Sequence, residues 1–299
     1  MPSKVPFTPL VFAAVIGVAV VAAALATGAA GRRRLAIVLT LPGWLSGLLL
    51  PLDQPIARAM VSFTALMMTM KVTDLARDRT ARALPDRVGY LFSAFELRTL
   101  RRVPARLDRA LAVKALFTGL ILALCTWVEV VAPREGASLV LRWGAGVLFF
   151  YALLDFFDGF FRALFLCAGF ATPPLQDAPI LSLTVREFWG KRWNLLVGGW
   201  LSRHLFRPLA RRRLPGAGAL LAFAFSGLIH AWPTVVGVGL LDGALMLSFF
   251  LAQTVLVHLE TRLGVDRWSV PAARTWVIGA MLLTSPLFVV PGLAVIGLR

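Results

Sequence analysis

The sequence is poor in charged residues, and this shortage excludes most classes of soluble protein. Asp, Glu, Lys and Arg make up 15% of the 299 residues, whereas hydrophobic residues make up 59% and the mean hydropathy is +0.79. A soluble domain of this length needs far less apolar surface. The apolar runs also lack the strand-like alternation of apolar and polar residues, which argues against a membrane β-barrel. The composition therefore predicts an all-α polytopic membrane protein.

Cysteine and histidine are scarce, with two and three residues in the chain. Cys125 and Cys167 lie in apolar stretches and show neither metal-ligand spacing nor a disulfide framework. We interpret them as small packing residues, and we expect no metal site. Acidic residues are also few, at 15 against 31 basic residues, which gives a formal net charge of +16. In a membrane protein this excess is explained by topology and anionic lipid headgroups, so we expect membrane lipids and no nucleic acid as partners.

About eight membrane spans can be read from the apolar runs, since roughly 20 apolar residues cross a bilayer. Of the 31 Lys and Arg residues, 26 lie in the four loops that share one side, at 31–34, 71–114, 158–215 and 259–274. The positive-inside rule places those loops in the cytoplasm and both termini outside. Pro42 and Gly43 are expected to interrupt the second span. The expected spans are residues 9–30, 35–52, 56–72, 111–132, 138–157, 216–236, 240–258 and 275–298.

A single histidine stands inside one of these runs. Residues 216–236 contain no Asp, Glu, Lys or Arg, and His230 is their only titratable group. A polar group in hydrocarbon costs several kcal/mol unless it is paired or lines a wet cavity. His230 therefore indicates either a functional site with a partner or a structural hydrogen bond to a neighbouring helix.

The segment 185–209, before this span, combines tryptophan and arginine at high density. Such residues suit a membrane interface. Asn194 is the exception, because it follows Arg192 and Trp193 directly and opens an apolar run. Its amide could orient a reacting group or hold a developing negative charge, or it could cap the helix that begins after it.

The stretch PLQDAPILSLTVREFWGKRWN, residues 174–194, resembles the signature of the wax synthase-like branch of the membrane-bound O-acyltransferases. A Pro-rich approach and a Ser/Thr-rich turn lead to an acidic residue, FWG, two basic residues and WN. The next span contains SGLIH, ending at His230, which resembles the family's small-residue approach to an intramembrane histidine. The span after it, SFFLAQTVLVHLE, resembles the family's FFL-x-Q…E helix and includes Gln253 and Glu260.

The resemblance implies a single integral membrane domain over residues 1–299, with N-terminal spans in 1–132, a catalytic core in 138–260 and a last span in 274–299. It implies acyl transfer from acyl-CoA, as co-substrate and without a bound cofactor, to the hydroxyl of a lipophilic alcohol. The product would resemble a wax ester or a sterol ester. Because the chain is short for this superfamily, it fits compact bacterial members, and we expect a bacterial-type inner or plasma membrane.

The same resemblance implies a catalytic pair. His230 would deprotonate the acceptor hydroxyl, and Asn194, 36 residues earlier, would bind the acceptor or the tetrahedral oxyanion. No serine or cysteine near His230 is a compelling nucleophile, so direct transfer is favoured over a covalent intermediate. The residues expected to bind substrate are Trp189, Lys191, Arg192, Trp193 and Ser226.

Depth in the membrane sets a condition on this pair. A straight helix from Gly216 would lift His230 by about 21 Å from the cytoplasmic side, whereas Asn194 falls in a cytoplasmic loop. We therefore expect residues 194–208 to re-enter the membrane, which is permitted where the backbone is buried in protein. A second basic stretch, 98–109, is amphipathic and suits the membrane surface.

Other interpretations stay open at this point. His204 is expected at the interface and His258 at a helix end, while Asp155 and Asp158 form either a cation or proton site or a solvated, Arg-paired group. A secondary transporter is the main alternative function, although no inverted repeat is detectable. A non-catalytic membrane scaffold is a third alternative. The polar path of the transporter would be His230, Asp155, Asp242 and Glu260.

Overall fold

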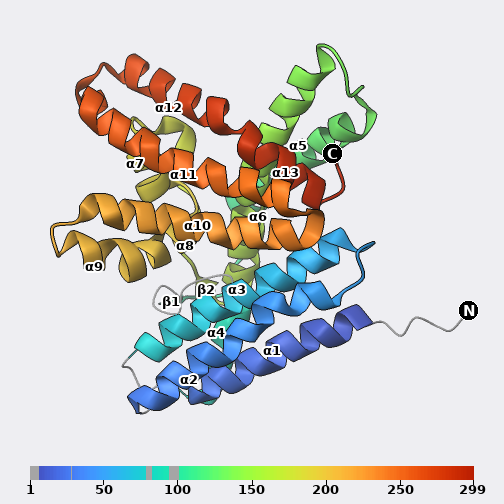
Figure 1. Cartoon of the computed structure of the whole chain (residues 1–299), viewed down its shortest axis with the longest axis vertical. Helices are drawn as coiled ribbons and strands as arrows, with labels where there is room; N and C mark the ends of the chain where they lie inside the picture. Colours follow the sequence, from blue (N-terminus) through green and yellow to red (C-terminus); the bar gives the residue numbers. More distant parts are fainter. Residues whose placement is uncertain (1–6, 28, 79–82, 94–100) are drawn as a thin grey trace, which may run out of the picture. The chain divides into compact units, whose positions relative to one another are not determined.

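The computed structural model describes residues 7–27, 29–78, 83–93 and 101–299, which form helices over most of their length (Figure 1). The chain divides into two compact units. Unit 1 comprises residues 1–94, 229–244 and 295–297, and unit 2 comprises residues 95–228, 245–294 and 298–299. The helices α10 (Pro215–Val238) and α11 (Leu240–Leu263) contribute to both units. The expected all-α polytopic membrane fold is confirmed, and the single-domain expectation stays a prediction.

Unit 1 is built around α3, which packs against α1, α2 and the 3-10 helix η1. The three α-helices lie side by side in Figure 1. The change from α2 to η1 falls at Leu41 and Pro42, because proline has no backbone N–H to continue the helical ladder. The expected interruption of the second span is therefore confirmed. The helices are α1 (Phe7–Leu25), α2 (Ala30–Thr40), η1 (Leu41–Leu49), α3 (Pro55–Arg77) and α4 (Leu84–Phe92).

Unit 2 begins with α5 (Arg109–Val131) and α6 (Ser138–Cys167), which lie side by side as an antiparallel pair (Figure 1). The remaining elements are short around the signature and long after it. They are η2 (Pro179–Leu181), α7 (Val185–Glu187), η3 (Phe188–Arg192), α8 (Leu195–Leu201), η4 (Ser202–Phe206), α9 (Arg207–Ala210), η5 (Val265–Arg267), α12 (Val270–Thr284) and α13 (Pro286–Val295).

The basic stretch before α5 forms an extended ribbon. Strand β1 (Arg101–Arg102) pairs antiparallel with β2 (Phe170–Ala171), and the N–H of Val103 donates to the carbonyl of Gly169 at 3.0 Å. These bonds tie the chain before α5 to the chain that follows α6. Residues 98–100 of the expected amphipathic stretch lie outside the described residues.

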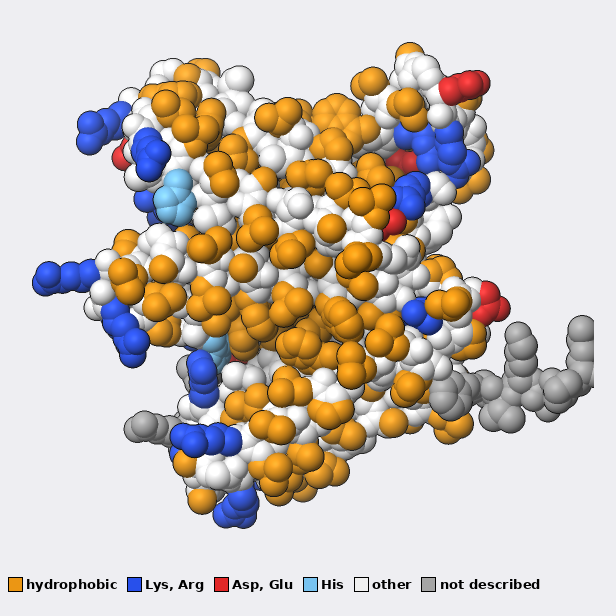
Figure 2. All heavy atoms as spheres, in the orientation of Figure 1, with side chains coloured by type: hydrophobic (Ala, Val, Ile, Leu, Met, Phe, Trp, Pro, Cys, Tyr) orange, Lys and Arg blue, Asp and Glu red, His pale blue; other side chains and the backbone are white. Residues whose placement is uncertain are grey.

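Among the described residues, five helices are long and apolar enough to cross a membrane, namely α1, α5, α6, α10 and α11. The pair α12 and α13 makes a sixth span if counted as one, with a bend of 47° where Pro286 interrupts the ladder. The expected count of eight stays a prediction. Large apolar side chains such as Leu116 and Val255 are exposed, as lipid-facing residues are. In Figure 2, hydrophobic side chains cover most of the visible face, and Lys and Arg side chains gather at helix ends.

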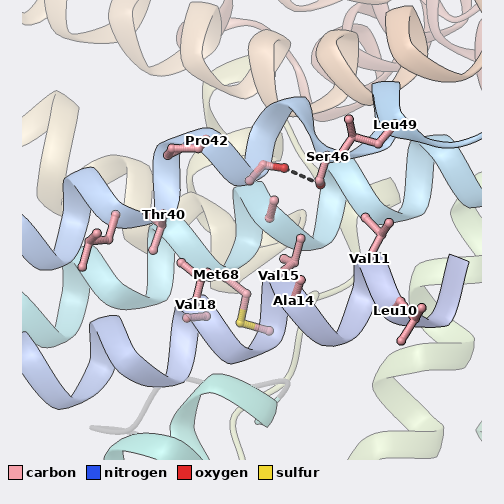
Figure 3. Close-up of a pocket in the computed structure, with 14 residues that line it drawn as sticks. Leu10, Val11, Ala14, Val15, Val18, Thr40, Pro42, Ser46, Leu49 and Met68 are labelled. Atoms are coloured by element: carbon pink, nitrogen blue, oxygen red, sulfur yellow. Dashed lines mark hydrogen bonds between the residues drawn. The ribbon is translucent and has the colours of Figure 1, made fainter. Parts of the chain in front are cut away.

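An apolar cavity of about 370 Å³ lies in unit 1. Figure 3 shows Val15 of α1, Pro42 of η1 and Met68 of α3 among the residues that line it. Two lining residues are polar, but the hydroxyls of Thr40 and Ser46 donate to backbone carbonyls one turn earlier. The cavity lining is therefore apolar in its chemistry.

A close approach at Gly47 joins η1 to α3. A Cβ atom at this position would lie 2.3 Å from Oγ of Ser62 and 2.4 Å from the carbonyl oxygen of Arg58. The buried guanidinium of Arg58 donates to the carbonyls of Leu50 at 2.6 Å and Val236 at 2.7 Å. These bonds satisfy a buried charge, and they fix the end of η1 against α3 and the end of α10.

Gly47→Ala is expected to destabilise the protein by about 1–3 kcal/mol, because the added methyl group meets backbone that cannot move aside. Thermal unfolding in detergent, followed by circular dichroism, measures the loss. Gly17→Ala in α1 is the matched control, since nothing lies within 4 Å of its added Cβ atom and alanine favours a helix. Equal unfolding temperatures for both variants would contradict the close approach.

Candidate functional site

The signature segment begins with a capped helical turn in unit 2. Thr184 is the N-cap of α7, and its hydroxyl accepts the N–H of Glu187 at 2.9 Å. The carboxylate of Glu187 accepts the N–H of Leu183 at 2.9 Å and pairs with Nε of Arg192 at 2.8 Å. This arrangement resembles a capping box. Burial raises the pKa of Glu187, but the Leu183 N–H and the Arg192 guanidinium outweigh it and lower that pKa below its ordinary value.

A carboxylate from the end of α11 holds the start of this turn. Glu260 accepts the N–H of Val185 at 2.6 Å and the N–H of Arg186 at 2.9 Å, and it is only 2% exposed. These N–H groups open α7 and have no acceptor within the helix. A carboxylate makes charge-assisted hydrogen bonds to such donors. Glu260, which the family resemblance includes, therefore positions the signature segment.

Gln253, seven residues earlier on the same face of α11, holds Trp189. The indole N–H of Trp189 donates to Oε1 of Gln253 at 3.2 Å, and the Gln253 amide donates to Oγ1 of Thr284 at 3.1 Å. Trp189 is therefore built into the packing of the unit, and its expected contact with substrate stays a prediction. Its ring centroid lies about 6 Å from those of Phe223, Phe249 and Phe250.

The next turn, η3, is a wide helical turn that ends at Trp193. The N–H of Trp193 donates to the carbonyl of Phe188 at 2.8 Å, and their rings stack at 5.4 Å. Arg192 is engaged, since its Nη1 donates to the carbonyl of Asp177 at 3.1 Å in addition to the pairing with Glu187. Lys191 is exposed and forms no ion pair with any described residue. Of the two cations expected to bind substrate, Lys191 is thus the one outside the ion pair with Glu187.

Asn194 has a left-handed backbone conformation, with φ of +41° and ψ of +62°. Asparagine is one of the few residues other than glycine that adopt this conformation readily. Its Oδ1 accepts the N–H of Val197 at 3.3 Å and caps α8. In the described part of the chain, no acceptor is bonded to its amide nitrogen. The cap and a catalytic role are therefore compatible, because they use different atoms of one amide.

Two backbone hydrogen bonds flank Asn194. The N–H of Asp177 donates to the carbonyl of Arg192 at 2.8 Å, and the N–H of Leu195 donates to the carbonyl of Leu175 at 2.7 Å. The loop that leads to the signature, residues 172–178, therefore runs beside the end of the signature, and its hydrogen bonds hold the backbone on both sides of Asn194.

The segment that was expected to re-enter the membrane is helical. It forms α8, η4 and α9 and folds back on α10, because Trp200 stacks on Phe225 at 5.4 Å and a Cβ at Gly218 would lie 2.9 Å from the Phe206 carbonyl. These elements and α10 form a helical hairpin whose turn lies just before Pro215. Asn194 lies at the end of the hairpin away from this turn. A helical hairpin satisfies the backbone donors that a re-entrant segment needs; the re-entry itself stays a prediction.

His230 belongs to α10 within unit 1, whereas Asn194 belongs to unit 2. The imidazole centroid lies 6.5 Å from that of Phe63 on α3, and the His230 carbonyl accepts the hydroxyl of Thr234 at 2.8 Å. Two residues after His230, the indole N–H of Trp232 donates to the carbonyl of Trp44 at 2.7 Å. The ring of His230 therefore faces Phe63 of α3, and Trp232, two residues later, ties the same helix to η1. The meeting of His230 with Asn194 stays a prediction.

The other expected residues are placed as follows. Ser226 is buried on α10, one turn before His230. His258 lies 2.8 Å, through Nδ1, from the Thr254 carbonyl. His204 lies against Trp200, with ring centroids 4.5 Å apart. The carboxylates of Asp155 and Asp158 both pair with Lys114, at 2.6 Å and 2.8 Å, and Asp158 also pairs with Arg162 at 3.3 Å.

Comparison with known proteins matches the same segment. Residues 172–252 match the membrane bound O-acyl transferase family. A long-chain-alcohol O-fatty-acyltransferase of Simmondsia chinensis is 38% identical over 65 residues, which is 19% of this chain and 18% of that protein. A probable long-chain-alcohol O-fatty-acyltransferase 9 of Arabidopsis thaliana is 28% identical over 131 residues, 41% of this chain and 37% of that protein. Diacylglycerol O-acyltransferase 1C of Glycine max is 44% identical over 48 residues, 16% of this chain and 9% of that protein.

The matches span at most 37% of these three relatives. The family match, residues 172–252, runs from the Pro-rich approach into α11 and includes residues of both units. Through this segment the chain is similar to the membrane bound O-acyl transferase family and, among the relatives, to long-chain-alcohol O-fatty-acyltransferases.

Proposed function

We propose that the protein transfers an acyl group from acyl-CoA to the hydroxyl of a lipophilic alcohol inside the membrane. The observation that carries this proposal is that the segment matching the family, 172–252, contains both Asn194 and His230. An imidazole supplies a base for an alcohol proton, and a primary amide supplies a donor for a developing negative charge. Esters of the wax or sterol type are the expected products.

The steps balance without a bound cofactor. A ring nitrogen of His230 takes the hydroxyl proton as the alcohol oxygen attacks the thioester carbonyl. A C–O bond forms, and the carbonyl oxygen becomes an oxyanion that the amide nitrogen of Asn194 stabilises by donating a hydrogen bond. The C–S bond then breaks, and the departing thiolate takes the proton back from His230. A water-poor site would protect the thioester from hydrolysis.

Acyl-CoA is charged and would arrive from the cytoplasmic side, where the charge sorting places the signature segment. Lys191 is the exposed cation of that segment. A bacterial-type inner or plasma membrane is the expected location. The transporter alternative is disfavoured because two members of its polar path are engaged elsewhere: Asp155 pairs with Lys114, and Glu260 binds the backbone of α7.

His230→Ala is expected to lower ester formation at least about a hundredfold, because the reaction loses its general base. Ester formation is measured by mass spectrometry, with acyl-CoA and a panel of fatty, sterol-like and terpenoid alcohols. His258→Ala is the matched control and should retain most activity, since its ring contacts a helix carbonyl. Full activity in His230→Ala would show that the base is misassigned. If the parent protein forms no ester from any alcohol, the transporter alternative moves ahead.

Asn194→Asp separates the cap from the chemistry. Aspartate keeps an oxygen for the Val197 N–H and tolerates the left-handed backbone, but it has no N–H to donate. We expect an unfolding temperature near that of the parent and a loss of kcat of about a hundredfold or more, the size of one oxyanion donor. Parent-like kcat in this variant would make Asn194 a helix cap only. Asn194→Gly should keep the backbone conformation and lose both the cap and the activity.

Lys191→Ala is expected to raise the apparent KM for acyl-CoA about two- to fivefold, the size of an exposed charge pair, with kcat and the KM for the alcohol unchanged. The effect should shrink as salt is added. Arg192→Ala should instead lower the unfolding temperature, since Arg192 pairs with Glu187 and the Asp177 carbonyl. An unchanged donor KM in Lys191→Ala would leave Lys191 only as an interfacial anchor.

A further inference from the structure

Asp158 is a fully buried carboxylate on α6 whose two oxygens have different partners. Oδ2 pairs with Nζ of Lys114 at 2.8 Å and with Nη1 of Arg162 at 3.3 Å. Oδ1 accepts the backbone N–H of Leu175 at 2.7 Å, and Asp158 is 0% exposed. One oxygen therefore serves the helix pair α5–α6, and the other holds the loop that leads to the signature.

Leu175 connects Asp158 to the backbone next to Asn194. Its N–H is bonded to Asp158, and its carbonyl accepts the N–H of Leu195, the residue directly after Asn194, at 2.7 Å. A single residue thus bridges α6 and the N-terminus of α8. Asn194 sits in a left-handed conformation, which lies above the ordinary backbone minimum and persists only where its surroundings hold it.

Packing of α5 on α6 does not account for the bond to Leu175. The two helices approach closely at Gly159, where an added Cβ would lie 3.0 Å from the backbone nitrogen of Ala115. Lys114 already has a second carboxylate partner there, Asp155 at 2.6 Å. The helix pair would therefore keep an ion pair without Asp158, whereas the loop would lose its anchor on α6.

We propose that Asp158 is a positioning residue, which holds Asn194 in its donor geometry through Leu175. This inference rests on the proposed function for its catalytic consequence, but the positioning itself can be measured without activity. Asp158→Asn keeps the size of the side chain. Its remaining oxygen is drawn to Lys114 and Arg162, so its amide NH₂ faces the Leu175 N–H, donor against donor.

The first measurement is amide hydrogen exchange of the full-length protein in detergent. Asp158→Asn should speed exchange about tenfold in the peptides that contain Leu175 and Leu195, because their hydrogen bonds open more often. Asp155→Asn is the matched control, since it changes the same Lys114 cluster and leaves the Leu175 bond intact. It should leave these peptides unchanged. Leu175→Pro, which removes the donor and leaves Asp158 in place, replaces Asp158→Asn if that variant does not fold, and its exchange is read at Leu195 because proline has no amide hydrogen.

The second measurement is the kinetics of ester formation. Asp158→Asn should lower kcat about ten- to hundredfold and change the KM of acyl-CoA and alcohol less than about twofold, because Asn194 is displaced from the transition state. In an Asn194→Asp background the same change should cost less than about threefold, since the group that it positions is already gone. A role in general stability would instead give losses that multiply.

The two measurements distinguish an error in the proposed function from an error in the positioning role of Asp158. If the parent forms no ester while exchange rises in Asp158→Asn, the proposed function is wrong and the positioning of Asn194 stands. Unchanged exchange in both Asp158→Asn and Leu175→Pro overturns the inference. Equal effects of Asp155→Asn and Asp158→Asn on exchange also overturn it, because the loop would then depend on the whole ion cluster.

Discussion

The position of the signature segment depends on one carboxylate, Glu260, bonded to the N–H groups of Val185 and Arg186. A short helical turn in a membrane protein cannot leave these donors to water, so a side chain must accept them. From this fixed start the chain runs through the wide turn η3 to the left-handed Asn194. Asp158 likewise accepts the N–H of Leu175 and so holds the loop that leads to the signature. Buried carboxylates that accept backbone N–H groups thus make an irregular segment possible in an apolar protein.

Helix positions could be predicted closely because hydropathy alone sets them. The expected span 216–236 is observed as Pro215–Val238, and 111–132 as Arg109–Val131. The fifth span was expected to end at residue 157, but α6 continues to Cys167. The reason is that Asp158 and Arg162 look like the start of a polar loop, whereas in the structure Asp158 pairs both with Arg162 and with Lys114 inside the unit. An ion pair between two helices cannot be read from the hydropathy pattern of either helix alone.

The residues of the candidate site were named from the sequence and stay predictions, whereas the contacts that support them could not be named from it. The chemistry of an intramembrane histidine and the block of residues around Asn194 could be recognised from sequence, because both are local. The hydrogen bonds that backbone N–H groups donate to Glu260 and Asp158 join positions 74–75 and 17 residues apart, and a backbone donor has no sequence signal. Two signals were available: an acidic residue inside an apolar span needs a partner, and Glu260 belongs to the helix that resembles the family's pattern.

These contacts separate the residues of the signature that hold its structure from those proposed to contact the reactants. Trp189, Glu187 and Arg192 are hydrogen-bonded within unit 2, so these three side chains have a structural role in this segment. The ammonium of Lys191 and the amide nitrogen of Asn194 are among the atoms of this segment that have no hydrogen bond to a described residue. A loss of activity after substitution of Trp189 would therefore report a displaced Asn194. A change in kcat or KM at Lys191 or Asn194, with the unfolding temperature preserved, reports the chemistry itself.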